Sequence, residues 1–387
     1  MPFTINNRCF EEVYITDADI YDRFVGGQLW MTGGNSFGTL GNGTAILTSS
    51  PVQTIAQGTN WSQISQRNHH TAAIKRDGSL WTWGNGGVGV LGDGTTINKC
   101  SPVQTISQGT DWKLVSAGGY HVAAIKTDGS LWLWGRGGHG NLATNNTTSQ
   151  CSPVQTISAG RNWKSVSTGW YHTVALKTDG TLWTWGCNVG GQLGDGTTIS
   201  KCSPIQTISQ GNNWKTVSAG ACQTGGVKTD GTLWLWGGNT IGQLGDGTTI
   251  SNCSPVQTIS QGNNWRTVSL GCSVGAGIKT DGTLWLWGRN DYGQLGNGNN
   301  TCNSSPVQTI SQGCNWRSVD NFGNAVGAIK TDGSLWVWGR NGSGTLGDGT
   351  ALSRSSPVQT AVGGRGWISV SMGTNTQAAG FITFREP

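Results

Sequence analysis

Hydrophobic and polar positions alternate along this chain in short runs that glycine-rich bends separate. In the run that starts at Trp112, alternating residues lead to Asp-Gly, and a second alternating run, Leu-Trp-Leu-Trp-Gly, follows at 131–135. A period of two indicates β-strands, and Asp-Gly between two such runs predicts a hairpin with a tight primed turn. Ser-Pro at 152–153 then leads into an edge segment, where proline omits a ladder donor without cost. We expect about four short strands in each unit.

The unit repeats along the chain with a spacing of 51 residues. Of the 21 tryptophans, 20 fall into three series with this spacing, which begin at Trp30, Trp61 and Trp83, and only Trp170 lies outside them. One small sheet leaves a face exposed to water, so the units must pack face to face, and radial packing of four-stranded sheets closes into a propeller. The sequence therefore predicts an all-β fold, a seven-bladed β-propeller of 51-residue, four-stranded repeats.

The two ends of the chain are predicted to share one blade. The Leu-Trp half of the unit occurs seven times, whereas the other half occurs eight times, so one copy is surplus in a ring of seven. We expect residues 367–384 to supply the inner strands of the blade that Leu29–Gly33 begins, which closes a propeller of residues 26–387. Residues 1–25 are predicted to be an N-terminal acidic arm or an extra edge segment. This arm holds five of the 19 acidic residues: Glu11, Glu12, Asp17, Asp19 and Asp22.

Composition and charge narrow the class of protein. Charged residues make up only 11% of the chain, which excludes a disordered polyelectrolyte. The net charge of +5 is spread out, with a lysine every 51 residues from Lys75 to Lys330. We interpret these lysines as solvated turn charges and expect no nucleic-acid partner. No apolar run has the length of a membrane span, and no secretory signal is recognisable, so we expect no membrane span and a cytoplasmic or virion location.

Cysteine and histidine also recur with the repeat. The position before Ser-Pro is cysteine in four blades: Cys100, Cys151, Cys202 and Cys253. Equivalent loop positions of a ring lie too far apart to bond, so we expect mostly free thiols, with Cys302 and Cys314 as the pair that could meet across one blade. His70, His121 and His172 stand in three adjacent blades, too far apart to share a metal. We find no catalytic residues, and expect no enzymatic activity, no metal and no cofactor.

Two windows vary from blade to blade on an otherwise constant frame. The window after Trp-Gly holds the bulky residues Phe37, His139 and Tyr292. The window after the Val-Ser run collects aromatic residues in three successive blades: His69, His70, Tyr120, His121, Trp170, Tyr171 and His172. Variable loops on a fixed frame are typical of binding surfaces, and aromatic anchors dominate protein interfaces. We predict that these residues form a binding site on one rim, with ordinary packing as the alternative.

The run at 118–135, Gly-x-x-His-x-Ala-Ala-Ile-Lys-x-Asp-Gly-Ser-Leu-Trp-x-Trp-Gly, and the run at 191–198, Gly-Gln-Leu-Gly-Asp-Gly-Thr-Thr, resemble the regulator of chromosome condensation repeat. The resemblance implies a seven-bladed propeller that binds proteins with one face. The family includes an exchange factor for a small nuclear GTPase, a secreted β-lactamase inhibitor and many bacterial and phage proteins. This chain has neither the room for the exchange factor's inserted wedge nor its basic tail, and we interpret it as the bacterial or phage type.

The sequence therefore predicts a non-enzymatic, protein-binding or structural propeller. Its near-identical repeats, low charge and missing export signal favour a component of a phage or bacterial surface assembly, such as a virion decoration, tail or host-recognition protein, with other assembly subunits as partners. An intracellular regulator that binds a GTPase or another protein is the alternative. A carbohydrate-binding, lectin-like propeller with a glycan partner is the third hypothesis.

Overall fold

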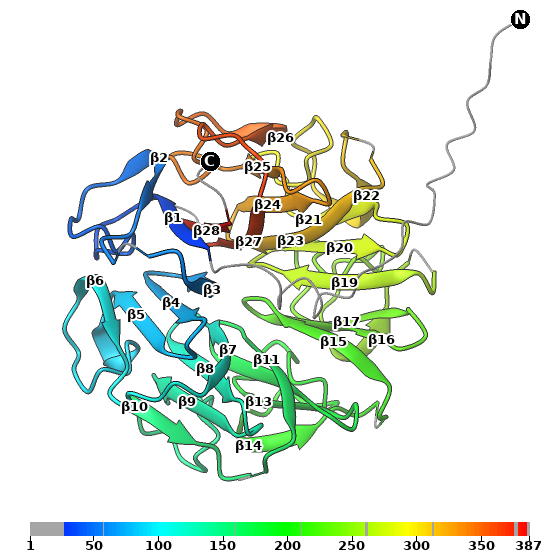
Figure 1. The fold of residues 1–387 in the computed structure, drawn as a ribbon. Helices are drawn as coiled ribbons and strands as arrows, with labels where there is room; N and C mark the ends of the chain where they lie inside the picture. The colour runs from blue at the N-terminus through cyan, green and yellow to red at the C-terminus, as the bar shows by residue number, and fades with distance from the viewer. Residues whose placement is uncertain are drawn as a thin grey trace, which may run out of the picture.

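A ring of β-sheets makes up the structure, a computed structural model. It describes residues 27–56, 58–158, 160–209, 211–259, 262–311, 313–374 and 378–384. These residues form seven four-stranded antiparallel sheets around one axis (Figure 1). The predicted all-β, seven-bladed propeller is confirmed, whereas the predicted arm of residues 1–25 lies outside the described residues.

Six blades are continuous in sequence, and each runs from an inner strand to an outer strand in chain order. Blade 1 consists of β3 (Trp61–Arg67), β4 (His70–Lys75), β5 (Leu80–Gly84) and β6 (Lys99–Gln104). Blade 2 consists of β7 (Trp112–Ala117), β8 (His121–Lys126), β9 (Leu131–Gly135) and β10 (Gln150–Gln155). Blade 3 consists of β11 (Trp163–Thr168), β12 (His172–Lys177), β13 (Leu182–Gly186) and β14 (Lys201–Gln206).

The other three continuous blades have the same construction. Blade 4 consists of β15 (Trp214–Ala219), β16 (Gln223–Lys228), β17 (Leu233–Gly237) and β18 (Asn252–Gln257). Blade 5 consists of β19 (Trp265–Leu270), β20 (Val274–Lys279), β21 (Leu284–Gly288) and β22 (Asn303–Gln308). Blade 6 consists of β23 (Trp316–Phe322), β24 (Ala325–Lys330), β25 (Leu335–Gly339) and β26 (Arg354–Gln359). A 3-10 turn, η1 (Gly87–Gly89), follows β5.

The two ends of the chain share the seventh blade. From the centre outward its strands are β27 (Trp367–Met372), β28 (Ala379–Thr383), β1 (Gln28–Gly33) and β2 (Thr48–Gln53). In the antiparallel pair of β1 and β28, Trp30 lies opposite Phe381, and Figure 1 shows the blue strand beside the red ones. The predicted role of residues 367–384 in closing the ring is therefore confirmed.

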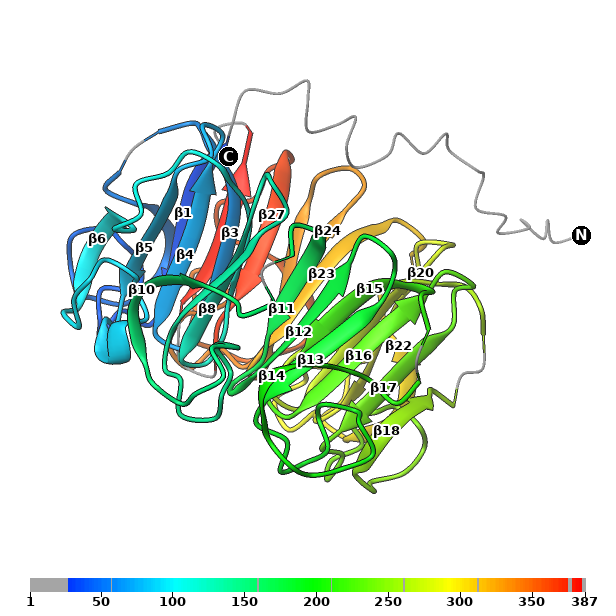
Figure 2. The same cartoon turned by 90° about the horizontal axis from the view of Figure 1, so that it is seen from below.

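The blades lie side by side around the ring (Figure 2). Neighbouring blades pack through the side chains of the Leu-Trp-x-Trp-Gly strand. Because side chains alternate along a strand, the leucines face one neighbouring blade and the tryptophans the other. Leu131 and Leu133 share a core cluster with Trp163 and Trp185 of the next blade. In six blades the second tryptophan of the strand is fully buried, and its Nε1 donates to a backbone carbonyl 44 residues earlier, at 2.8–3.0 Å. Each of these tryptophans thus joins two blades by packing and by a hydrogen bond.

The Asp-Gly hairpins differ in detail from the predicted primed turn. The Lys126 N–H donates to the Ser130 carbonyl and the Gly129 N–H to the Lys126 carbonyl, both at 3.0 Å. In this loop only Gly129 has a positive φ, 80°, so it is a three-residue loop with a glycine bulge. The Asp128 carboxylate accepts bonds from the N–H and Oγ of Ser130, and that Oγ accepts the Trp132 Nε1–H at 2.9 Å. The motif thus orients the first tryptophan of the strand.

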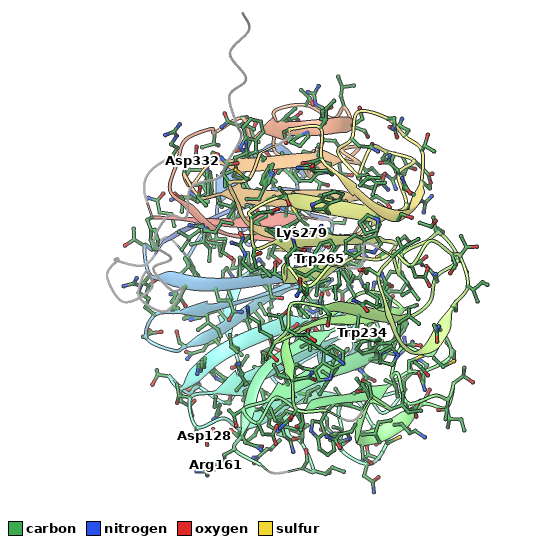
Figure 3. All side chains as sticks on the ribbon, turned by 90° about the vertical axis from the view of Figure 1, so that its right-hand side faces the viewer. Asp128, Arg161, Trp234, Trp265, Lys279 and Asp332 are labelled. Carbon is green, nitrogen blue, oxygen red and sulfur yellow. The ribbon has the colours of Figure 1, made fainter. Side chains whose placement is uncertain are left out.

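The recurring lysines are not the solvated turn charges that we predicted. In Figure 3, Lys279 lies next to Trp265. Its Nζ is 5.1 Å from the centre of that ring and 4.5 Å from the ring of Trp285. The same contacts recur in the other continuous blades, and a cation over an aromatic ring contributes about 0.5–1 kcal/mol at exposed sites. The lysine therefore links the first and third strands of its blade.

A belt of hydrogen bonds joins the inner strands around the centre. In six blades, an inner-strand serine Oγ accepts the backbone N–H of the next blade's inner strand. The pairs are Ser65–Ala117, Ser116–Thr168, Ser167–Ala219, Ser218–Leu270, Ser269–Asn321 and Ser371–Gln66, at 2.8–3.3 Å. In blade 6, Asp320 replaces the serine and accepts the Met372 N–H at 2.7 Å. Within the described residues the belt is a complete circle.

An ion pair spans the closing blade. The two terminal guanidinium nitrogens of Arg67, in blade 1, each lie 3.0 Å from a carboxylate oxygen of Asp320, in blade 6. The guanidinium also stacks 4.5 Å from the centre of the Phe322 ring and donates to the Met372 carbonyl at 3.0 Å. The two side chains are only 15% and 17% exposed. Five other blades have glycine where blade 1 has Arg67, so this pair is specific to the closure.

Replacing Arg67 by the glycine of the other blades should destabilise the ring. Arg67→Gly leaves the carboxylate of Asp320 largely buried without its partner, which costs about 3 kcal/mol of unfolding free energy. Urea denaturation of the purified protein measures this loss.

The matched control is the double variant Arg67→Gly with Asp320→Ser, because serine keeps the belt hydrogen bond and removes the unpaired charge. It should recover most of the lost stability. Additive losses in the two single variants and the double variant would contradict a coupled pair.

Candidate functional site

The two variable windows lie on one rim of the propeller. The Arg136 N–H, just after Trp-Leu-Trp-Gly, donates to the Tyr120 carbonyl in the hairpin between the first two strands, at 2.9 Å. The equivalent bonds are Asn85–His69, Cys187–Tyr171, Gly238–Cys222, Arg289–Ser273 and Arg340–Asn324, at 2.8–2.9 Å. The Asp-Gly turns occupy the other end of the strands. In these six blades the two windows therefore lie at the same end of the sheet, opposite the Asp-Gly turns.

Four side chains of blades 2 and 3 form an aromatic and basic group on this rim, which we call the rim cluster: Tyr120, Arg136, His139 and Tyr171. The two tyrosine rings stack at 5.2 Å with an angle of 9° between their planes. His139 contacts the edge of Tyr171 at 4.9 Å. The Arg136 guanidinium lies 5.6 Å from one tyrosine ring and 5.4 Å from the other. Burial, and then the neighbouring Tyr120, raise the pKa of Tyr171 above its ordinary value.

Four other predicted residues lie on the rim outside this cluster: Phe37, His69, Trp170 and Tyr292. Phe37 contacts His69 edge-on at 4.6 Å, between the closing blade and blade 1. Tyr292 lies under Arg340, 5.0 Å from its guanidinium, and forms a separate pair. Trp170 is half-buried. It packs so tightly on the preceding blade that a Cβ at Gly119 would lie 2.9 Å from its Cα.

The three repeat histidines lie inside the propeller. His121 and His172 are fully buried, so they belong to the packing between blades and not to the exposed surface. The His121 Nε2 lies 2.8 Å from the Thr173 Oγ1 of the next blade, and His172 makes the equivalent contact with Thr224 at 3.0 Å. His70 is 2% exposed.

The pKa values of these histidines are strongly depressed. Burial lowers the pKa of His70 and His121 to about 3, with a smaller effect from nearby histidines. Burial also lowers the pKa of His172 to about 4. The three rings are therefore neutral at physiological pH, and the residues that the structure describes contain no group of three or more His, Cys, Asp or Glu able to hold a metal ion.

Sequence reasoning missed Arg136, Arg67 and Asp320. Arg136 directly follows Trp134-Gly135, and a comparison of that position across the blades would have shown a basic residue beside the tyrosines. Arg67 stands where five blades have glycine, and Asp320 where six have serine. For Arg67 and Asp320 the signal was thus available as single departures from the repeat, whereas arginine recurs at the position of Arg136 as Arg289 and Arg340.

Eight cysteines of the described residues are free thiols: Cys100, Cys151, Cys187, Cys202, Cys222, Cys253, Cys272 and Cys302. A bond between Cys302 and Cys314, which the sequence left open, is not formed, because Cys302 keeps its thiol and lies 3.5 Å from the carboxylate of Asp291. The described ranges also contain no helix with the length and hydropathy that crossing a bilayer requires.

A cavity of about 350 Å³ lies at the opposite rim, beside the Asp-Gly turns. Its walls include the scaffold residues Trp61, Trp112, Lys75 and Gly78, which recur in most blades. Because these residues build the hairpins and the packing between blades, we assign the candidate site to the variable rim.

Lowering the pH from 7 to 5 should destabilise the fold through the buried histidines. Their folded pKa values lie below the unfolded value of 6.5, so the unfolded chain binds protons first. Their contribution is complete above pH 6.5 and is lost as the pH falls toward 3 or 4, by about 2 kcal/mol per histidine at pH 5. Urea denaturation at both pH values measures the loss.

The matched control replaces His121 and His172 by glutamine, the residue that blade 4 has at this position as Gln223. This variant should lose about 4 kcal/mol less than the wild type between the two pH values. Equal losses in both proteins would contradict this assignment.

Comparisons with known proteins agree with the fold. The RCC1-like domain family matches residues 28–379. The ultraviolet-B receptor UVR8 of Arabidopsis thaliana is 31% identical over 316 residues, which cover 80% of this chain and 68% of the receptor. The E3 ubiquitin-protein ligase HERC2 of Homo sapiens is 28% identical over 347 residues, 86% of this chain but 7% of the ligase.

A solved structure gives the same picture. The crystal structure of Prp20p from Saccharomyces cerevisiae, reported with its binding properties to Gsp1p and histones, has a TM-score of 0.81 and 17% identity, over 97% of this chain and 96% of that chain. At this identity the likeness shows the fold alone. These relatives are eukaryotic, so they give no support to the predicted bacterial or phage type. By family match and identity to UVR8, the chain belongs to the RCC1-like domain family.

Proposed function

We propose that this chain is a non-enzymatic, intracellular regulator that binds a protein partner through the rim cluster. The observation that carries the proposal is the stack of Tyr120 and Tyr171 under Arg136 on the variable rim. Tyrosine and arginine are enriched in the centres of protein interfaces, because both offer a large contact area together with a polar end. Tyr120 is 36% exposed, so part of the stack is accessible to a partner.

The relatives favour this interpretation over a phage or bacterial surface assembly. UVR8 is named as a receptor, and the Prp20p structure is reported together with binding to Gsp1p and histones. Ligase activity is not part of the proposal, because the chain spans 7% of HERC2. Nucleotide exchange is not part of it either, since the even spacing of 51 residues leaves no room for an inserted wedge.

The geometry of the rim cluster favours a protein over a glycan. A sugar ring binds on the open face of an aromatic side chain. Here Tyr120 and Tyr171 stack on each other at 5.2 Å, and Arg136 lies over both rings. One face of each ring is therefore covered by the other tyrosine, and His139 packs against Tyr171, so the stack offers a pyranose less open ring face, whereas its hydroxyls and the guanidinium suit a protein surface.

Replacing Tyr120 and Tyr171 by alanine should weaken partner binding without unfolding the propeller. Loss of an aromatic hot spot costs about 2 kcal/mol, or roughly 30-fold in affinity. Affinity capture from the source cells with tagged full-length protein identifies the partner that binds stoichiometrically. Titration of that purified partner against both proteins then measures the change in Kd.

One control variant and two contrary results define the outcome. Lys215→Ala changes an exposed side chain of inner strand β15 near the opposite rim and should leave the Kd unchanged. A partner that binds the double alanine variant as tightly as the wild type would refute the rim assignment. Specific binding on a glycan array that disappears in the double variant would favour the lectin hypothesis instead.

A further inference from the structure

We propose that the acidic arm, residues 1–25, binds back to its own propeller and fills the cavity of about 350 Å³ beside the Asp-Gly turns. This inference is independent of the proposed function, which uses the variable rim. The cavity spans three blades, and its walls include Ile368 of the closing blade, Ser62 and Arg76 of blade 1, and Trp112 and Lys113 of blade 2. A cavity of about 150 Å³ holds one benzene molecule, so this cavity has room for about two aromatic side chains.

The cavity lies where a longer side chain bridges two blades elsewhere in the ring. In blade 5 the Nη2 of Arg266 donates to the first two carbonyls of the inner strand of blade 6, both at 2.8 Å. Ser62 is the equivalent residue of blade 1 and is too short to make this bridge. Trp112 and Lys113, the residues that an arginine at this position would contact, line the cavity instead. The cavity is therefore a departure from the repeat and not a feature of every blade boundary.

The walls of the cavity carry an excess of positive charge. Lys75, Arg76 and Lys113 line it together with one carboxylate, that of Asp77. Arg76 is specific to blade 1, because the other five continuous blades have threonine at this position. Lys113 is exposed and belongs to none of the ion pairs between described residues. A concave basic wall concentrates ligands of the opposite charge, so the cavity favours an acidic occupant.

The arm has the complementary chemistry. Residues 1–25 contain five acidic residues and only two basic ones, Arg8 and Arg23, whereas the whole chain has a net charge of +5. The acidic residues are interleaved with aromatic ones: Phe10, Tyr14, Tyr21 and Phe24. The arm therefore offers carboxylates for the cations of the cavity and rings for its apolar walls.

The ring itself has no place for the arm. The arm contains the surplus copy of the inner half of the unit, and β27 and β28 already occupy the corresponding positions of the closing blade. By the spacing of 51 residues, Asp22 and Arg23 correspond to Ala73 and Ile74, which are 0% and 3% exposed. Charges at such buried positions are strongly unfavourable. This excludes the arm from the inner strands and leaves a site on the surface of the propeller.

The arm also joins the propeller at the edge of the cavity. The Gly27 N–H donates to the Trp61 carbonyl at 3.0 Å, and the Gly27 carbonyl accepts the Trp61 N–H at 3.1 Å. Trp61 is part of the cavity wall. Residues 17–22 lie five to ten positions before Gly27, within about 15–35 Å of extended chain. Linkage over this distance gives an effective concentration on the order of millimolar, which favours the chain's own arm over a separate acidic protein.

Zero-length cross-linking of the full-length protein tests the contact. A carbodiimide joins a carboxylate to a lysine amine only where the two touch, and mass spectrometry identifies the joined residues. Lys113 should be joined to carboxylates of the arm. Lys164 and Lys215, exposed lysines at the same repeat position in blades 3 and 4, should not be joined to it.

Mixing ¹⁴N-labelled and ¹⁵N-labelled protein separates cross-links within one chain from those between two chains. No cross-link of the arm to Lys113, or equal cross-linking of Lys113, Lys164 and Lys215, would overturn the proposal. Cross-links of the arm to Lys113 that occur only between two chains would overturn it too, in favour of the arm of a second copy.

Hydrogen exchange of the full-length protein, followed by mass spectrometry, gives an independent measurement. The amides of residues 10–24 should exchange more slowly than those of an unfolded peptide. The double variant Arg76→Thr with Lys113→Ala removes two cations of the cavity and should speed this exchange about tenfold, because the bound state of the arm becomes less populated.

The matched control, Lys164→Ala with Lys215→Ala, removes the same charge at equivalent places outside the cavity and should leave the exchange of the arm unchanged. Exchange of the wild-type arm at the rate of an unfolded peptide, or an equal acceleration in both double variants, would show that the arm does not occupy the cavity.

Discussion

The circle of hydrogen bonds between inner strands is the constraint on which the rest of this structure depends. Each blade supplies one acceptor oxygen and one backbone N–H, so every blade is bonded to both neighbours, and the last bond, from Gln66 N–H to Ser371, exists only because the two chain ends meet in one blade. A ring of this kind has no free edge at its centre. The closure also carries the ion pair of Arg67 and Asp320, which adds a second connection between the inner strands there.

Farther from the centre of the ring, tryptophan side chains hold neighbouring blades together. One tryptophan of each continuous blade packs against its neighbour and bonds to that neighbour's backbone, while another lies under the recurring lysine. The closing blade departs from this rule, because Thr32 stands where tryptophan is expected, and its hydroxyl donates to the Gly344 carbonyl at 2.9 Å. The contact between blades is thus kept with a smaller side chain at the place where the chain ends join.

Such a frame leaves one rim free to vary, and that freedom explains the candidate site. The hydrogen bond between the two windows holds their backbones in the same relation in six blades, so a change of side chain alters the surface and not the fold. Tyr120 of the rim cluster also lines a pocket of about 130 Å³ between blades 1 and 2.

The sequence by itself determined the number of blades, the period of 51 residues and the sharing of the last blade, because a strict repeat forces equivalent positions into equivalent places on a ring. It also placed Tyr120, Tyr171 and His139 on neighbouring blades. Only the tertiary structure decided which side chains point outward: His121 and His172 look like their exposed neighbours in sequence, yet their strand positions face the next blade. The pair of Arg67 and Asp320, 253 positions apart, was visible only in the closed ring. A repeat pattern tells which blade a residue belongs to, but not which way its side chain points or how deeply it is buried.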